Sequence, residues 1–289
     1  MNDKKFFIIV TYEYEKIHID NLISRLLRTE LKIIQNTTES NLGYGGGANA
    51  AIGEGLKKNF DWFVVMNQDI KITKQAVTEF EKKLDKTESG IAGPFTGRLD
   101  PKRWSTMLEK EEKTGSPIEA PGMTGWDGFR TSQSDKDHYL GLLRRQNGVA
   151  MTQLDYISGA FMAVHRKVFE KIGLFYTSYF VYYEDADLCI RAQRAGFPLT
   201  EIKIEGITHE ESMSLGKGSF KHEYYLARNH LLFIERNAPV DVKLHEALRM
   251  PKTLWVHYRN KNWGALTGIR DYALRRFGEY KSGFPSAQE

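Results

Sequence analysis

Apolar residues along the chain gather in short runs that are separated by polar turns. Runs rich in β-branched and aromatic side chains predict buried strands at residues 5–11, 31–35, 62–66, 90–93, 160–164 and 199–204. Helical spacing alternates with these runs at residues 22–28, 50–58, 74–84, 166–172 and 184–195. This alternation predicts an α/β fold with a mainly parallel, Rossmann-like sheet and helices on both faces. Ligands of such sheets gather at the carboxyl ends of the strands.

Two regions depart from this alternation. Residues 94–154 are polar and contain four prolines together with Trp104 and Trp126, which predicts a loop-rich insertion. The two indole rings either stack on a sugar or anchor the loop to the body. From residue 220 onward the pattern is helical, with breaks expected at Pro239 and Pro251. We therefore divide the chain into residues 1–218 and a helical extension, 219–289.

Composition supports a soluble globular protein with a large core, since 41% of the 289 residues are hydrophobic and 27% are charged. The one cysteine, Cys189, excludes an internal disulfide and a cysteine-rich metal site. No apolar run approaches the roughly 18 residues of a spanning helix, and no signal peptide is recognisable. These features predict a cytoplasmic location.

Charge is distributed unevenly along the chain. The net charge of +4 is too small to indicate nucleic-acid binding. Residues 219–289, however, hold 12 Lys and Arg against 7 Asp and Glu, and include Trp255, Tyr258 and Trp263. This pattern predicts either a solvated helical face with the aromatic rings turned to the core, or peripheral contact with anionic lipid at the inner face of the cell membrane.

A glycine-rich segment at residues 41–49 precedes a predicted helix. Gly43, Gly45 and Ala48 match the dinucleotide-binding spacing loosely, whereas the three consecutive glycines and Asn49 do not favour it. Glycine at these positions either lets the backbone pass close to a ligand or a neighbouring strand, or forms a tight turn.

Acidic residues follow two of the apolar runs. Asp20 and Asp69 are both expected just past a strand. A carboxylate at the position of Asp69 suits Mg²⁺ or Mn²⁺, because these cations prefer oxygen ligands and bridge diphosphates. The alternative is an aspartate of a turn or helix start. His209 follows another predicted strand and either has a structural role or completes the shell of a divalent metal.

An acidic cluster, Glu184-Asp185-x-Asp187, lies at a predicted helix start. Carboxylates are stabilised there by the helix dipole, and Asp187 with Arg191 has the spacing of an ion pair. Aromatic residues precede the cluster, at Tyr176, Tyr179, Phe180, Tyr182 and Tyr183. Such a wall of rings can remove water from one carboxylate, raise its pKa and make it a better base.

Taken in order, five segments resemble the family-2 glycosyltransferases, especially bacterial rhamnosyltransferase-like and related cell-surface polysaccharide enzymes. These segments are NLGYGGGAN (41–49), WFVVMNQD (62–69), residues 156–175, residues 179–197 and His209. The resemblance implies a GT-A fold and an inverting transfer of a sugar from a nucleoside-diphosphate donor to a saccharide acceptor. It favours dTDP-rhamnose, or a UDP-hexose or UDP-galactofuranose, and includes a lipid-linked acceptor among the alternatives.

The resemblance also assigns roles to residues. It implies that Asp69 and His209 ligate Mn²⁺ or Mg²⁺ and that Asp185 takes the proton of the acceptor hydroxyl. Donor contacts are implied for Thr11, Tyr12, Asp20, Gly43, Gly45, Gly46, Asn49, Asn67 and Gln68. Acceptor contacts are implied for Trp104, Trp126, Tyr183 and Glu184.

The chain departs from the family pattern at its amino end, where Tyr12 and Asp20 lie close together and Glu13 replaces an asparagine. Asn67 stands where the first acidic member of the metal motif is usual. Two rival functions follow from the sequence. One is a catalytically silent glycosyltransferase-fold protein that binds carbohydrate or serves as a scaffold, and the other is a nucleotide-dependent enzyme such as a dehydrogenase.

Overall fold

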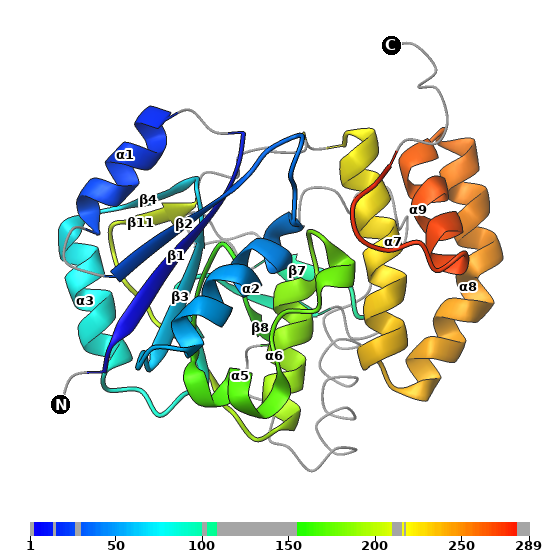
Figure 1. The fold of residues 1–289 in the computed structure, drawn as a ribbon. Helices are drawn as coiled ribbons and strands as arrows, with labels where there is room; N and C mark the ends of the chain where they lie inside the picture. Colours follow the sequence, from blue (N-terminus) through cyan, green and yellow to red (C-terminus); the bar gives the residue numbers. More distant parts are fainter. Residues whose placement is uncertain are drawn as a thin grey trace.

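The computed structural model describes residues 3–13, 16–26, 30–99, 103–108, 155–209, 216 and 218–281. Its centre is a six-stranded sheet in the order β10-β5-β9-β3-β1-β2 (Figure 1). These strands are β1 (Lys5–Tyr12), β2 (Glu30–Asn36), β3 (Trp62–Asn67), β5 (Ile91–Gly93), β9 (Phe161–His165) and β10 (Leu199–Glu201). The pairs β1–β2, β1–β3 and β5–β10 are parallel, which confirms the predicted mainly parallel α/β sheet.

Strand β9 runs against its neighbours, antiparallel to both β3 and β5. The start of β9 therefore lies at the same edge of the sheet as the carboxyl end of β3. A hydrogen bond joins the two ends, from the backbone N–H of Asn67 to the carbonyl of Ala160 at 2.9 Å. This reversal brings the turn at residues 158–160 beside the segment that carries Asp69.

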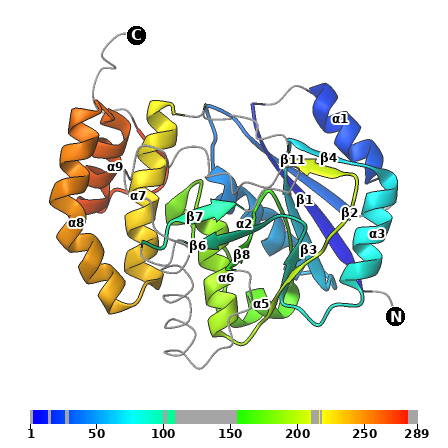
Figure 2. The same ribbon diagram turned by 180° about the vertical axis from the view of Figure 1, so that it is seen from behind.

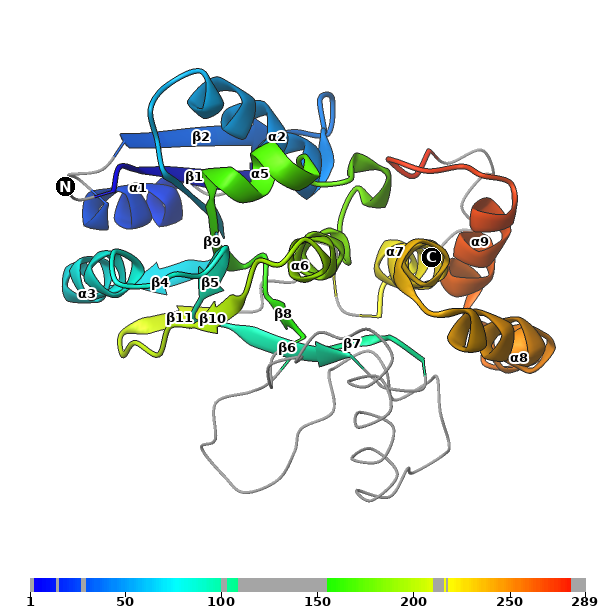
Figure 3. The ribbon, with the colours of Figure 1, turned by 90° about the horizontal axis from the view of Figure 1, so that it is seen from below.

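Helices cover both faces of the sheet, because side chains alternate across each strand. Phe7 and Ile9 of β1 share a core with residues of α1 (Lys16–Arg25) and α3 (Lys74–Leu84). Ile8 and Val10 share the opposite core with residues of α2 (Gly43–Leu56), α5 (Arg166–Ile172) and α6 (Glu184–Arg194). Figure 3 shows α1 and α3 on one side of the sheet and α2, α5 and α6 on the other.

Two small sheets extend the fold. Strands β4 (Ile70–Ile72) and β11 (Ile207–His209) pair antiparallel directly after β3. Strands β6 (Thr96–Leu99), β7 (Thr106–Leu108) and β8 (Tyr156–Ile157) form a second antiparallel sheet in the order β7-β6-β8. The rest of the predicted loop-rich insertion lies outside the described residues.

Three helices follow at one side of the sheet, as both Figure 1 and Figure 2 show: α7 (Phe220–Asn237), α8 (Val240–Arg259) and α9 (Trp263–Ala273). Helix α9 lies tightly against α7. A Cβ atom at Gly264 would meet the carbonyl oxygen of Phe220 at 2.4 Å, and one at Gly268 would meet that of Tyr224 at 2.3 Å. Glycine at these two positions permits the close approach.

Three sequence predictions are wrong in detail. Asp20 does not follow a strand, because Ile19 and Leu22 are buried at helical spacing and place it inside α1 with an exposed side chain. The glycine-rich segment is not a loop before α2, because Gly43 is the first residue of that helix. Pro251 does not end a helix but lies inside α8. None of the described helices has the length and apolar character needed to cross a bilayer.

Candidate active site

Asp69 and His209 come together through the pairing of two short strands. The antiparallel register of β4 and β11 sets His209 opposite Ile70. As a result, Nε2 of His209 lies 3.3 Å from Oδ2 of Asp69, and both side chains are largely buried. A carboxylate and an imidazole are ligands that suit Mn²⁺ and Mg²⁺ when substrate phosphates complete the shell.

This donor set fits a metal that is shared with a substrate. Within the described ranges, no cluster of three or more His, Cys, Asp and Glu side chains has the arrangement of a metal site. A site that depends on Asp69 and His209 therefore leaves several coordination positions for oxygen atoms of a diphosphate or of water.

The first turn of α6 carries three carboxyl groups, and the first two, Glu184 and Asp185, lie in contrasting surroundings. Asp185 accepts backbone hydrogen bonds from Gly159 and Ala186, at 2.8 Å each. Glu184 is buried, and its Oε2 atom has no hydrogen-bond partner among the residues that the structure describes. Burial, followed by the charge of Asp185, raises the pKa of Glu184 to about 8. Burial also raises the pKa of Asp185, while its backbone hydrogen bonds oppose that shift.

Hydrogen bonds from backbone N–H groups distinguish the two carboxyl groups electrostatically. Hydrogen bonds from N–H groups stabilise a carboxylate, whereas a buried oxygen without a donor favours the protonated acid. The two N–H donors therefore favour the charged form of Asp185, and the buried Oε2 atom favours the neutral form of Glu184.

Tyr44 lies beside the turn that binds Asp185, and the sequence prediction did not include it. Its hydroxyl donates to the carbonyl of Gly159, the residue whose N–H binds Asp185. Burial raises the pKa of Tyr44 well above its ordinary value, and the charges of Glu184, Asp185 and Asp69 raise it further. One phenol therefore lies within the electrostatic range of all three acids. The position of this tyrosine between Gly43 and Gly45 was the feature of the sequence that could have singled it out.

Residues with left-handed backbone come directly before the first turn of α6, which carries Glu184, Asp185 and Asp187 and which we call the acidic turn. Phe180, Tyr182 and Tyr183 have φ angles of 68°, 67° and 74°, in a region that non-glycine residues seldom occupy. Such conformations persist where surrounding structure holds them, and they are frequent at active sites. The segment at 180–183 is therefore held in place by contacts from outside itself.

Helix α7 supplies those contacts through two fully buried side chains, Arg228 and Asn229. The Asn229 amide donates to the carbonyls of Tyr179, Val181 and Tyr182 at 2.8, 2.6 and 3.1 Å. The Arg228 guanidinium donates to the carbonyls of residues 178 and 179 at 3.3 and 2.9 Å. Together these side chains fix the path of the chain that leads into Glu184 and Asp185.

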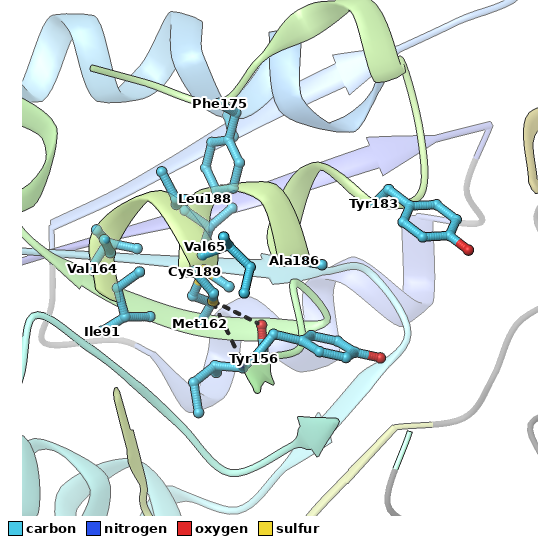
Figure 4. Packing of buried hydrophobic residues seen from close by; sticks show 14 of the residues in the cluster. Val65, Ile91, Tyr156, Met162, Val164, Phe175, Tyr183, Ala186, Leu188 and Cys189 are labelled. Atoms are coloured by element: carbon cyan, nitrogen blue, oxygen red, sulfur yellow. Dashed lines mark hydrogen bonds between the residues drawn. The ribbon is translucent and has the colours of Figure 1, made fainter. Parts of the chain in front are cut away.

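Asp187, in the same first turn of α6, is fully buried, and the side chains that contact it belong to the fold rather than to an open surface. Its carboxylate accepts hydrogen bonds from the side chains of Tyr179, Arg191, Arg236 and Asn237. The predicted ion pair with Arg191 is confirmed at 2.7 Å. Below this turn, Leu188 and Cys189 pack against Val65 and Met162 in the core (Figure 4).

Several predicted donor residues are occupied by contacts within the protein. The side-chain amide of Gln68 bonds the backbone N–H and carbonyl of Tyr12, at 2.9 and 3.2 Å. Asn49 bonds the backbone N–H and carbonyl of Phe175 in the same way, at 3.0 and 2.8 Å. Thr11 is buried, and its hydroxyl donates to the carbonyl of Ile34 at 3.3 Å. These side chains connect segments of the fold around the carboxyl end of the sheet.

The glycines that were predicted to contact the donor face the loop before α6. A Cβ atom at Gly43 would meet the carbonyl oxygen of Phe180 at 2.3 Å, and one at Gly45 would meet Phe175 at 3.2 Å. A Cβ atom at Gly46 would meet Leu42 at 3.2 Å. At Gly43 and Gly45, glycine therefore permits the close approach of the segment at residues 175–180, which is a loop rather than the neighbouring strand that the sequence suggested.

Two of the aromatic acceptor candidates, Trp104 and Tyr183, are buried. Trp104 is 5% exposed and packs against Phe233 at 6.1 Å between ring centroids, as expected of a loop anchor rather than of a stacking platform. Tyr183 is buried, and its hydroxyl lies 3.2 Å from Nδ1 of His230. Trp126 lies outside the described residues.

Comparison with known proteins finds similarity to two glycosyltransferases. No family model matches the chain. The low-salt glycan biosynthesis hexosyltransferase Agl10 of Haloferax volcanii is 26% identical over 256 residues, which cover 80% of this chain and 76% of that protein. The N-acetylglucosaminyl-diphospho-decaprenol L-rhamnosyltransferase of Mycobacterium tuberculosis is 24% identical over 202 residues, which cover 67% of this chain and 62% of the relative.

Two solved structures of low similarity are also matched. One is the mannosyltransferase PcManGT of Pyrobaculum calidifontis in complex with GDP-Man and Mn²⁺, with a TM-score of 0.46, 13% identity, and coverage of 95% of this chain and 76% of that one. The other is TarS of S. aureus, with a TM-score of 0.42, 13% identity, and coverage of 88% and 43%. The two curated relatives confirm the predicted resemblance, so this chain is similar over most of its length to glycosyltransferases of glycan biosynthesis.

Proposed function

We propose that the chain is a metal-dependent, inverting glycosyltransferase that moves a sugar from a nucleoside-diphosphate donor to a saccharide acceptor. The observation that carries this proposal is that the turn at residues 158–160 links Asp185 to the segment that carries Asp69. The N–H of Gly159 donates to Asp185 at 2.8 Å, and the carbonyl of Ala160 accepts from the N–H of Asn67 at 2.9 Å. Asp69 contacts His209 at 3.3 Å, and Asp69 and Asp185 both act on the pKa of Tyr44. The glycosyltransferase relatives support the same class of reaction.

The pair Asp69 and His209 has one task in this proposal, and Asp185 has another. Asp69 and His209 would hold a divalent cation, which when bound offsets the negative charge of the departing diphosphate. Asp185, oriented by the N–H of Gly159, takes the proton of the acceptor hydroxyl as that oxygen attacks the anomeric carbon. Attack on the face opposite the diphosphate inverts the configuration of that carbon.

Glu184 keeps the neighbouring position neutral. With a pKa near 8, it carries its proton at neutral pH and adds no second negative charge beside Asp185. The protonated carboxyl can donate a hydrogen bond to an acceptor oxygen, which agrees with the role expected for it from the sequence. Gly43, Gly45, Gly46, Asn49, Asn67 and Gln68 shape the donor side through the backbone that they hold in place.

The donor and acceptor are proposed from the family resemblance and from the names of the two relatives. A dTDP- or UDP-sugar is the proposed donor, with rhamnose or a hexose as the transferred group. The name of the mycobacterial relative contains a sugar linked through diphosphate to decaprenol. We propose a lipid-linked saccharide as the acceptor here and the inner face of the cell membrane as the place of reaction.

The test is a thermal-shift and turnover screen of the purified full chain. UDP, dTDP and NAD are each added with and without Mn²⁺, and transfer from UDP- and dTDP-sugars is then measured. We expect a nucleoside diphosphate to stabilise the protein only when Mn²⁺ is present, and one donor to be consumed. Stabilisation by NAD without metal would indicate a different class of enzyme. Binding of carbohydrate without consumption of any donor would indicate the catalytically silent alternative.

A further inference from the structure

Helix α8 has its apolar and polar faces reversed relative to an ordinary surface helix. Five large apolar side chains on it are between 59% and 79% exposed, namely Val240, Leu244, Leu248, Trp255 and Tyr258. Successive members lie three, four or seven residues apart, a spacing that places them along one side of a helix. We call these five residues the apolar stripe.

The face of α8 that is turned to the protein is largely polar. Glu246, Thr253 and His257 are buried there, together with Val242. Glu246 forms an ion pair with Arg103 at 3.1 Å, in which both side chains are almost fully buried. Buried polar side chains therefore make up much of the contact between α8 and the body, while the five residues of the apolar stripe remain in solvent. Retaining large apolar side chains on the free side marks that side as an interaction surface.

Aromatic rings extend the stripe around the corner between α8 and α9. The ring centroid of Tyr258 lies 6.3 Å from that of Trp255 and 6.0 Å from that of Trp263. Trp263 is also exposed. Trp and Tyr combine an apolar ring with a polar N–H or O–H group, and this combination suits the boundary between hydrocarbon and lipid headgroups.

Basic side chains flank the stripe. Lys243 borders it on one side, Lys252 and Arg259 border it on the other, and all three are exposed. Lys261 adds a further exposed positive charge in the turn after α8, whereas Asp241 is the exposed acid of the helix. Positive charge beside an exposed apolar and aromatic face is complementary to an anionic lipid surface.

We infer that the apolar stripe docks α8, lying flat, on the surface of a bilayer that contains anionic lipid. A helix of this length lies along about 30 Å of the surface. The stripe enters the headgroup region, and Lys243, Lys252 and Arg259 contact lipid phosphates at its borders. This docking stands independently of the catalytic proposal. Its benefit for a lipid-linked acceptor is a consequence that rests on the proposed function.

Co-sedimentation of the full chain with vesicles tests the inference. One vesicle preparation is phosphatidylcholine alone, and the other contains about one third phosphatidylglycerol, a proportion high enough to give a negative surface potential. We expect binding to the anionic vesicles that is at least about tenfold stronger and that weakens in 0.5 M salt, because salt screens the basic side chains. No nucleotide sugar or metal is added, so failure of the catalytic proposal would leave this result unaffected.

Three variants locate the contact. Leu248→Glu and Trp255→Ser should each lower partitioning onto anionic vesicles about tenfold, since each removes a large apolar group from the buried area. Gln75→Glu is the matched control, because Gln75 is an exposed residue of α3 and the substitution adds the same single negative charge as Leu248→Glu. The control should bind as the parent chain does.

Two results would overturn the inference. In the first, the parent chain fails to bind anionic vesicles at low salt, or the stripe variants bind them as well as the control does. In the second, analytical ultracentrifugation without lipid shows a dimer that Leu248→Glu converts to a monomer while vesicle binding is unchanged. The stripe would then be an interface with a second copy of this chain.

Discussion

The first turn of α6 and the outer face of α8 depart from ordinary burial in opposite directions. Helix α6 buries Glu184 and Asp187, whereas α8 exposes Leu248, Trp255 and other large apolar residues. Each arrangement has an unfavourable hydration free energy unless something compensates it. In α6 most of the compensation lies within the protein, and in α8 we expect it to come from a partner.

The acidic turn itself contains both solutions to the burial of a carboxyl group. Asp187 receives four hydrogen-bond donors, two of them from arginine. Glu184 instead has a raised pKa, and Asp185 binds backbone N–H groups beside Tyr44. The difference separates a carboxylate that stabilises the fold from the carboxyl groups that we propose for proton transfer and acceptor binding.

Substitution of Asp185 should have the largest effect. Asp185→Asn retains the size of the side chain but removes the base, so we expect transfer to fall about 10²–10⁴-fold. The affinity for the nucleoside diphosphate, measured by titration calorimetry with Mn²⁺, should be unchanged. Turnover close to that of the parent chain would show that another group takes the proton.

Asp187→Asn should instead reduce stability. It leaves the guanidinium groups of Arg191 and Arg236 beside a neutral amide, and breaking one partner of a buried ion pair costs about 3–5 kcal/mol. Urea unfolding followed by circular dichroism gives the free energy of unfolding. A loss below about 1 kcal/mol would remove the distinction that we draw between the two ends of the acidic turn.

Asp69→Ala tests the proposed metal site of Asp69 and His209. We expect the Mn²⁺-dependent affinity for the donor to fall about 10–100-fold, in line with the loss of a group that positions a metal. Asp20→Ala is the matched control, because it removes an exposed carboxylate of α1. Equal losses in both variants would contradict the assignment of Asp69 and would support the nucleotide contact that the sequence suggested for Asp20.

The pH dependence of stability follows from Glu184. Its folded-state pKa of about 8 lies above its ordinary value of 4.5, so the contribution to stability is present below pH 4.5 and is lost as pH rises through 8. Glu184→Gln removes this dependence. The variant should gain on the parent chain as pH rises from 5 to 9, by on the order of 1–3 kcal/mol at the alkaline end. A constant difference across that range would place the titration elsewhere.

Leu248→Glu should have the smallest effect on the fold. Leu248 is 74% exposed, and substitutions at such positions change the free energy of unfolding by about 0.5 kcal/mol or less. Thermal unfolding in the absence of lipid measures this change. A marked loss of stability would mean that the outer face of α8 packs against the protein, unlike the face described here.

Local pattern predicted most of the sheet, because strands such as β1 and β3 are continuous apolar runs. The family resemblance, rather than the local pattern, implied that Asp69, His209 and Asp185 belong to one site, and this remains a prediction. The role of Tyr44 was missed because it depends on Gly159, which only tertiary structure brings near. Asp20 was misplaced because two isoleucines resemble a short strand until the spacing to Leu22 is included.

The side chains of Arg228 and Asn229 donate hydrogen bonds across the expected division of the chain after residue 218. That division remains a prediction, and these two side chains lie beyond it while holding the carbonyls that lead into α6. A fragment ending at residue 218 would retain every proposed catalytic residue yet lose the donors that keep Tyr182 and Tyr183 left-handed. The smallest unit able to present Asp185 in its working geometry therefore includes α7. Any fusion or truncation of this protein has to preserve that helix.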